Sequence, residues 1–263
     1  MWLDHLSDNI YSVRNNSAKA LARVYQDAEI YRDDLYAKFG EYLSENLMKA
    51  KEQTEHSHKH TNLQNDTQFG VAKPVADADH ENNQMYSCGS LAPKLKRGGG
   101  CMDHGFTRHT ELWEYSDGCI FLIKELSKVR CESDAKVVSK VVELISKHIE
   151  DFSYIGFIDH FKHAAHMKEH LFKSASVLCS PEGLGKKKFR PFVEIFMDPT
   201  FRNTNHSTQN CAVAAQDFLI TLEKVYGENI TKAIIESQNP SYLEEFMMFK
   251  QASMNHVGDF VYP

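Results

Sequence analysis

Two cysteines and two histidines in the middle of the chain could bind a metal ion. Cys88, Cys101, His104 and His109 are spaced C-x12-C-x2-H-x4-H. Zinc prefers four nitrogen and sulfur ligands in a tetrahedron, and the short C-x2-H spacing can supply two of them from one turn. Because Cys88 has no close mate, a glycine-rich loop in which these side chains pack locally is the alternative interpretation.

Two short basic runs form a second group of candidates, which could bind anions or acidic partners. They lie in KLKRGGG and LGKKKF and supply Lys94, Lys96, Arg97, Lys186, Lys187 and Lys188. Neither run has the spacing or the Lys-Ser/Thr ending of a phosphate-binding P-loop. The two runs are either simple solvated charge or a docking patch for an acidic protein surface or tail.

Four histidines, His160, His163, His166 and His170, follow one another at intervals of three, three and four residues. On a helix this spacing gives one stripe, which suits a metal-binding, pH-sensitive, partner-binding or solvated polar face. The sequence contains no metalloprotease H-E-x-x-H, no nucleophile elbow, no kinase signature and no dinucleotide fingerprint. We therefore predict a non-catalytic protein that needs no cofactor.

The composition is ordinary for a globular protein, with 42% hydrophobic and 25% charged residues among 263. The net charge of −6 argues against general nucleic-acid binding, because phosphate contacts need a basic surface. The sequence has no apolar run of about 18 residues for membrane insertion, and its start, MWLDHLSDN, does not resemble a signal peptide. We expect a cytoplasmic chain with reduced cysteines, and ciliary, cytoskeletal or nuclear locations stay open.

The elements that must position these residues are helical in pattern. Residues 1–50 and 118–253 carry apolar side chains at helical spacing, whereas residues 51–117 read as a polar, irregular insert and residues 254–263 as a tail. Helices of about 12–20 residues joined by short turns indicate antiparallel helix hairpins. Such hairpins either stack into a solenoid or close into a bundle.

The clearest of these helices covers residues 8–24, with Asp8 as a plausible N-cap. Small residues, which let a neighbouring helix approach closely, are frequent on the face that we expect to be buried. That face consists of Ile10, Val13, Ser17, Ala20, Leu21 and Val24, and the small residues that we expect to be buried are Ser17, Ala18, Ala20 and Ala22. Arg14 lies about one turn inside the helix, and its guanidinium either reaches an acidic group in an adjacent unit or extends to water.

The same segment resembles the second half of a HEAT repeat. That pattern has Asp in the inter-helix turn, Val-Arg at the start of the second helix, and then small residues and leucine at set intervals. The matching residues are Asp8, Val13, Arg14, Ala20, Leu21 and Ala22, with Ser17 in place of one alanine. In HEAT arrays the Asp and the Arg form a ladder, so the resemblance implies that Asp8 and Arg14 tie one repeat to the next.

Other parts of the chain match the repeat more weakly. Residues 197–219 offer Asp198 in the turn and Ala212 and Ala215 in the helix, but Gln209 stands where the arginine would be. The resemblance implies an all-α fold, an irregular HEAT/armadillo-like helical-hairpin solenoid interrupted by a long Gly/His-rich loop.

The family's typical role implies a non-catalytic protein-binding scaffold or adaptor, either a subunit or a fragment of a larger assembly. Its partners would be other proteins, and the insert at residues 51–117 is too long for a simple connector, so it would serve recognition. The alternative function is a zinc-binding protein with its site in the 88–109 loop.

The N-terminal edge carries a further expectation. Only MWLDHL is available for the first helix of the first pair, so an apolar face near Trp2, Leu3 and Leu6 is expected to lack a cover. A solenoid normally needs capped ends. The chain would then be an isoform or fragment of a longer array, or a partner would cover this edge.

Overall fold

The structure is a computed structural model that describes residues 2–54, 109–131 and 135–258. Within these ranges all regular secondary structure is helical, which confirms the predicted all-α class. The α-helices are α1 (Tyr11–Asp27), α2 (Arg32–Asn46), α4 (Leu112–Ser127), α5 (Ala135–Tyr154), α6 (Ala164–Cys179), α7 (Gly185–Phe189), α8 (Met197–Phe201), α9 (Gln209–Tyr226), α10 (Glu228–Gln238) and α11 (Pro240–Gly258). The short 3-10 helices are η1 (Asp4–Ser7), η2 (Glu29–Tyr31), η3 (Lys49–Glu52), η6 (Ile155–Phe157), η7 (Arg190–Phe192) and η8 (Glu194–Phe196).

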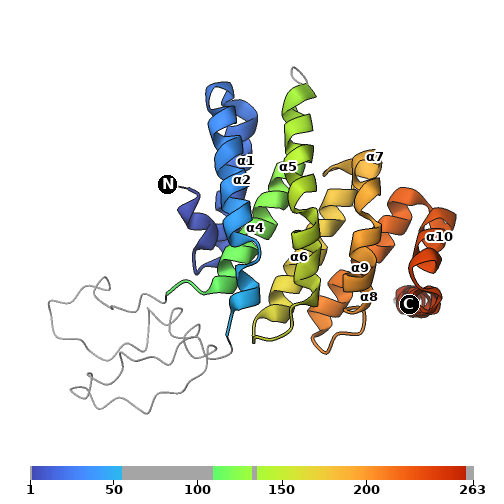
Figure 1. The fold of residues 1–263 in the computed structure, drawn as a ribbon. Helices are drawn as coiled ribbons and strands as arrows, with labels where there is room; N and C mark the ends of the chain where they lie inside the picture. The colour runs from blue at the N-terminus through green and yellow to red at the C-terminus, as the bar shows by residue number, and fades with distance from the viewer. Residues whose placement is uncertain (1, 55–108, 132–134, 259–263) are drawn as a thin grey trace, which may run out of the picture. The chain divides into compact units, whose positions relative to one another are not determined.

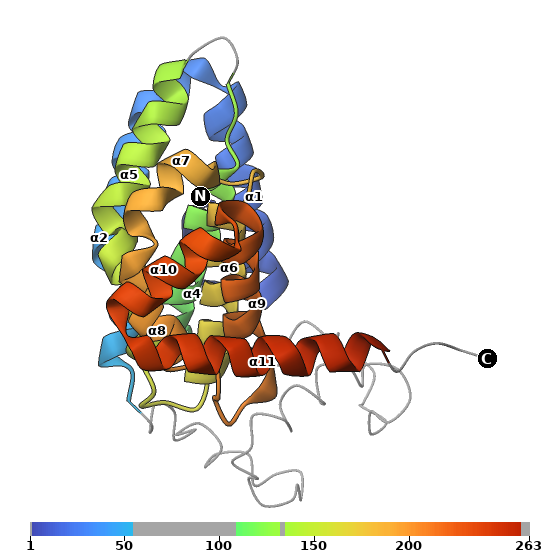
Figure 2. The ribbon, with the colours of Figure 1, turned by 90° about the vertical axis from the view of Figure 1, so that its right-hand side faces the viewer.

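Four of these helices pack one after another in chain order (Figure 1). α1 packs against α4, α4 against α6, and α6 against α9. α2 contacts both α4 and α5, and α10 packs against α9 and α11. Figure 2 shows α11 lying across the direction of α9. We call α1, α4, α6 and α9 the central row, because each packs against the next.

α4 is enclosed on almost every side by α1, α2, α5, α6, η1 and η3. Thirteen of its sixteen residues are buried, and five of these are polar or charged: Glu114, Ser116, Asp117, Glu125 and Ser127. The helix starts at Leu112, within the range predicted to be irregular. A capping box fixes this start, because the Glu111 and Glu114 side chains each accept a hydrogen bond from the other's backbone N–H.

Gly118 of α4 allows η1 to approach very closely. A Cβ atom on Gly118 would lie 1.8 Å from the backbone oxygen of Leu6, which is impossible without movement of η1. Leu6 is fully buried as a result. Of the apolar face expected to lack a cover, Leu6 is therefore covered by α4, Leu3 is half-buried and Trp2 is half-exposed.

The buried face of α1 differs from the predicted one. Arg14, Ala18, Leu21, Ala22 and Tyr25 are buried, which confirms the predicted burial of Leu21 and of the small residues Ala18 and Ala22. The rest of the predicted face is exposed at Ile10 or half-buried at Val13, Ser17, Ala20 and Val24. The helix is turned this way because its arginine faces inward, toward the carboxylates of α4. Of the two alternatives that the sequence left open for Arg14, the structure shows the contact with acidic groups of a neighbouring helix.

The other end of the row is packed with aromatic rings. The Phe196 ring lies 5.6 Å from both the Phe189 and the Phe218 ring, and the Phe189 and Phe218 rings lie 6.4 Å apart. All three side chains are fully buried. These rings join α7, η8 and α9 by edge-to-face and tilted contacts of the kind that aromatic pairs prefer.

Candidate functional site

A buried chain of charged side chains runs through three helices of the central row. Arg14 of α1 donates from Nε to Oδ2 of Asp117 in α4 at 2.9 Å, and its Nη2 lies 2.8 Å from the same oxygen. The other oxygen of Asp117, Oδ1, lies 2.6 Å from Nδ1 of His170 in α6. We call Arg14, Asp117 and His170 the polar ladder, because it joins α1 to α4 and α4 to α6.

Two further groups surround the guanidinium of Arg14. Its Nη1 donates to the backbone oxygen of Asp8 at 2.6 Å and lies 3.5 Å from Oε1 of Glu114. The guanidinium carbon also lies 5.2 Å from the centre of the Trp113 ring. Arg14 thus has a partner on each side of its planar fork, which explains why a charge can be buried here.

The charges of the ladder are almost completely shielded from solvent. The exposed fraction of the side chain is 2% for Arg14, 7% for His170, and zero for Asp117 and Glu114. Burial alone would raise the pKa of Asp117, but the neighbouring His170 and Arg14 together outweigh it and hold this pKa below its ordinary value. Asp117 is therefore ionised in the folded chain, and the ladder fixes how three helices meet.

Asp8 takes part in this arrangement through its backbone. Its carboxylate accepts a hydrogen bond from the backbone N–H of Ile10 at 2.8 Å, just ahead of α1. Its carbonyl oxygen is the acceptor for Arg14. The pairing proposed for Asp8 and Arg14 thus joins a side chain to the main chain, and the carboxylates that meet Arg14 come from α4.

Only two of the four histidines, His166 and His170, are in ring contact with each other among the described contacts, with ring centres 4.2 Å apart. α6 begins at Ala164, so His160 and His163 precede it. His163 stacks on Trp113 with ring centres 5.1 Å apart, His166 is exposed, and His170 belongs to the polar ladder. In the part of the chain that the structure describes, no group of three or more His, Cys, Asp or Glu side chains could hold a metal ion.

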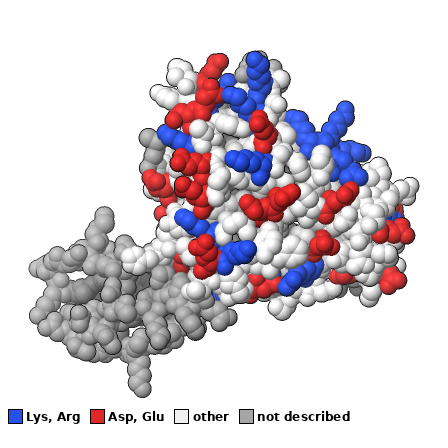
Figure 3. All heavy atoms as spheres, viewed as in Figure 1, with Lys and Arg blue, Asp and Glu red and all other residues white. Residues whose placement is uncertain are grey.

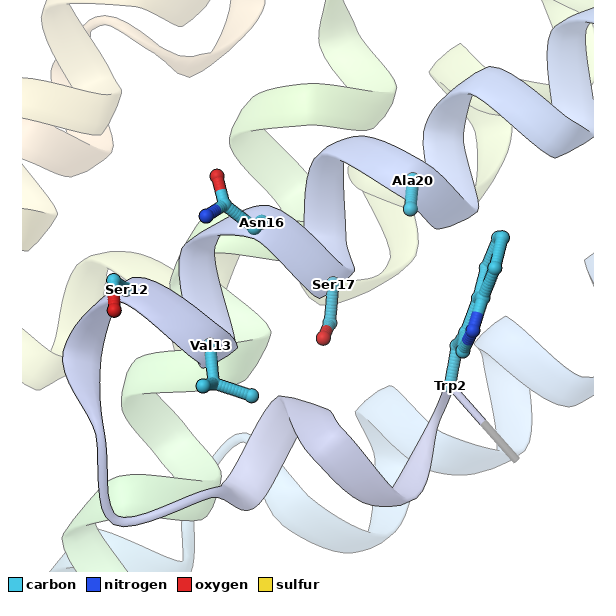
Figure 4. A pocket seen from close by; sticks show the side chains of 6 residues that line it. All are labelled: Trp2, Ser12, Val13, Asn16, Ser17 and Ala20. Atoms are coloured by element: carbon cyan, nitrogen blue, oxygen red, sulfur yellow. The ribbon is translucent and has the colours of Figure 1, made fainter.

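The outer face of α1 forms a shallow groove (Figure 4). The groove encloses about 300 Å³ and is lined by Trp2, Ser12, Val13, Asn16, Ser17 and Ala20. In Figure 4 the Trp2 ring stands beside α1, near Ala20, while the small side chains form the floor. This face, the α1 edge, is the one that the sequence predicted to be buried.

The second basic run is displayed on α7. Lys186, Lys187 and Lys188 are all exposed. In Figure 3, viewed as in Figure 1, blue side chains gather where α7 lies. The first basic run, with Lys94, Lys96 and Arg97, lies outside the described residues.

The proposed zinc ligands fall mostly outside the described part of the chain. Cys88, Cys101 and His104 are not described, and His109 is exposed at the start of a described range. The zinc interpretation therefore stays a prediction. In the described ranges no helix combines the length and apolar character that crossing a membrane requires.

Comparisons with known proteins give no family assignment. No family model, no curated protein and no solved structure matches this chain. The resemblance to HEAT repeats thus rests on the residues themselves.

Sequence reasoning singled out Arg14 and His170 but missed Asp117, the residue that joins them. Asp117 lies in WEYSDG, which contains two acidic residues and reads as the end of a polar insert. Its only signal is its place directly ahead of the apolar run GCIFLI, where a carboxylate in a buried helix needs a cationic partner.

Proposed function

We propose that this chain is a non-catalytic protein-binding scaffold of HEAT/armadillo type, and that it binds a partner through the α1 edge. The successive packing of α1, α4, α6 and α9 supports a stacked array of helices, and the polar ladder supports contacts repeated from one unit to the next. The α1 edge carries an open groove lined by small side chains, which a partner helix can approach.

The observation that carries this proposal is the uneven distribution of exposed apolar side chains. Five of the nine large hydrophobic side chains that are exposed in the described residues lie between Trp2 and Tyr31: Trp2, Ile10, Tyr11, Ile30 and Tyr31. Single exposed apolar residues are normal on a protein surface, but Trp2 lines a groove together with Val13 and Ala20, which indicates an interaction site there. Ser17 and Ala20 are small enough for a partner helix to approach α1 closely.

A photo-crosslinking experiment tests this proposal. In one variant p-benzoylphenylalanine replaces Ser17 on the α1 edge. In the matched control it replaces Glu41, which is exposed on α2. Both forms are irradiated in an extract of the source cells, and mass spectrometry identifies the adducts.

We expect one heterologous protein to crosslink at position 17 but not at position 41. Ala20→Arg places a charge in the groove and should reduce this adduct at least about fivefold, because an unpaired charge in an apolar contact is costly. Equal crosslinking at both positions, or an adduct that Ala20→Arg leaves unchanged, would overturn the proposal.

A further inference from the structure

α7 displays three adjacent lysines on a rigid support. Gly183 closes the preceding turn, where a Cβ atom would lie 2.1 Å from the backbone oxygen of Val177. Phe189, the last residue of α7, is fully buried among aromatic rings. The Tyr226 hydroxyl donates to the backbone oxygen of Lys186 at 2.9 Å. The backbone that carries the lysines is therefore held at both ends and from one side.

The positive charge of α7 is largely uncompensated. Lys187 and Lys188 form no ion pair with the residues that the structure describes, and Lys186 lies 5.8 Å from the centre of the Tyr226 ring. Two nearby carboxylates already have other partners: Glu182 lies 3.0 Å from Lys128, and Glu194 lies 3.6 Å from Arg190. Like charges held this close repel one another, so an added anionic partner would relieve the repulsion.

The arrangement of the lysines restricts the class of partner. Three consecutive residues of a helix point in directions about 100° apart, so their side chains fan out over roughly 200°. Neither a flat anionic membrane nor the rigid backbone of a nucleic-acid duplex can meet all three at once. A short, flexible acidic peptide can bend around α7 and contact each ammonium group.

We infer that Lys186, Lys187 and Lys188 form a docking site for an acidic, extended segment of a partner protein. This inference rests on the proposed scaffold function and names the chemistry of one partner segment. The site is separate from the α1 edge, so the two surfaces can be tested independently. Lysine ammonium groups meet carboxylates as point charges, without the planar match of arginine, so binding should depend strongly on charge and weakly on sequence.

Fluorescence anisotropy with a fluorescein-labelled peptide of ten alternating Asp and Glu residues tests the inference. The full chain is compared with Lys187→Glu/Lys188→Glu, whose positions are exposed and leave the core unchanged. The matched control is Lys19→Glu/Lys147→Glu, which changes the net charge equally at exposed positions of α1 and α5. Circular dichroism melts verify that all three proteins fold.

We expect the α7 variant to bind the peptide at least about tenfold more weakly and the control variant less than about twofold more weakly, at low salt of about 50 mM, where surface charges are poorly screened. Equal losses in both variants, or no binding by the unmodified chain, would overturn the inference. Binding of phosphatidylserine vesicles or of single-stranded DNA with the same dependence on α7 would also overturn it, because the partner would then belong to another class.

Together, the peptide-binding and crosslinking experiments distinguish failure of the α7 inference from failure of the scaffold proposal. Lys187→Glu/Lys188→Glu should leave the crosslink from position 17 unchanged, because α7 packs against α6 whereas α1 packs against α4. If the crosslink persists while peptide binding is absent, only the α7 inference fails.

Discussion

The two ends of the central row are equally buried but are held by different interactions. At the junction of α1, α4 and α6, the charged groups of Arg14, Asp117 and His170 meet in fixed directions. At the junction of α7, η8 and α9, the rings of Phe189 and Phe196 pack with Phe218. One junction excludes water from charges, and the other excludes it from hydrocarbon.

This difference predicts different responses to mutation. A buried ion pair is costly to break, because removal of one partner leaves an uncompensated charge in the interior. An aromatic cluster loses only the contacts and the volume of the atoms removed, since its interactions have no strict direction. The charged end should therefore set the geometry of the row, while the aromatic end supplies stability that varies gradually with packing.

Arg14→Met should have the largest effect. It removes the cation while keeping much of the apolar stem, so Asp117 and Glu114 stay buried without their partner. We expect the free energy of unfolding to fall by about 3–5 kcal/mol, measured by urea denaturation followed by circular dichroism.

Two controls accompany this measurement. The double variant Arg14→Met/Asp117→Leu should lose less stability than the sum of the two single variants, because neither Arg14 nor Asp117 is then left buried without the other. Arg23→Met removes an exposed arginine of the same helix, whose partner is Asp27, and should change stability by less than about 1 kcal/mol. Additive losses in the double variant would contradict the polar ladder.

Phe218→Leu should have a smaller effect at the aromatic end. The change removes ring atoms that contact Phe189 and Phe196 but keeps an apolar side chain, so we expect a loss of about 1–2 kcal/mol. The loss should be the same in about 0.05 and 1 M sodium chloride, because no charge is involved. A loss as large as that of Arg14→Met would remove the distinction between the two junctions.

Local patterns in the sequence were enough to predict the helices. Apolar spacing over residues 118–253 predicted the helical class there, and α5, α6, α9 and α10 lie in that range. The start of α4 was harder to predict, because it directly follows the polar insert and its cap uses Glu111 in place of Ser or Thr. The arrangement of the helices, in contrast, depends on pairs far apart in the chain.

Arg14 illustrates this limit most clearly. Its position in a HEAT-like pattern indicated an interhelical contact, but the partner, Asp117, lies 103 residues away in the sequence. Periodicity placed Val13 and Ser17 on the buried face because it assigns a charged residue to the outside. The helix is rotated so that Arg14 faces the buried carboxylates of Glu114 and Asp117 in α4. No pattern within the segment around Arg14 contains that information.

The pH dependence of the free energy of unfolding tests the difference between the charged and the aromatic junction through the smallest expected effect. Asp117 has a pKa below its ordinary value of 3.8 in the folded chain, so the folded state binds fewer protons at this carboxyl than the unfolded state. Its contribution to stability is therefore fully present above that ordinary value and is lost as the pH falls through the lower, folded pKa. Asp117→Asn has no such proton to gain.

The difference in the free energy of unfolding between the unmodified chain and Asp117→Asn should hence shrink by about 1 kcal/mol between about pH 6 and pH 3. Urea titrations at each pH measure it, with Phe218→Leu as the matched comparison from the aromatic end. The difference for Phe218→Leu should stay constant over the same range, because no titrating group touches that ring among the described contacts. If both differences shrink alike, acid weakens the whole core, and the polar ladder has no separate part in holding the row together.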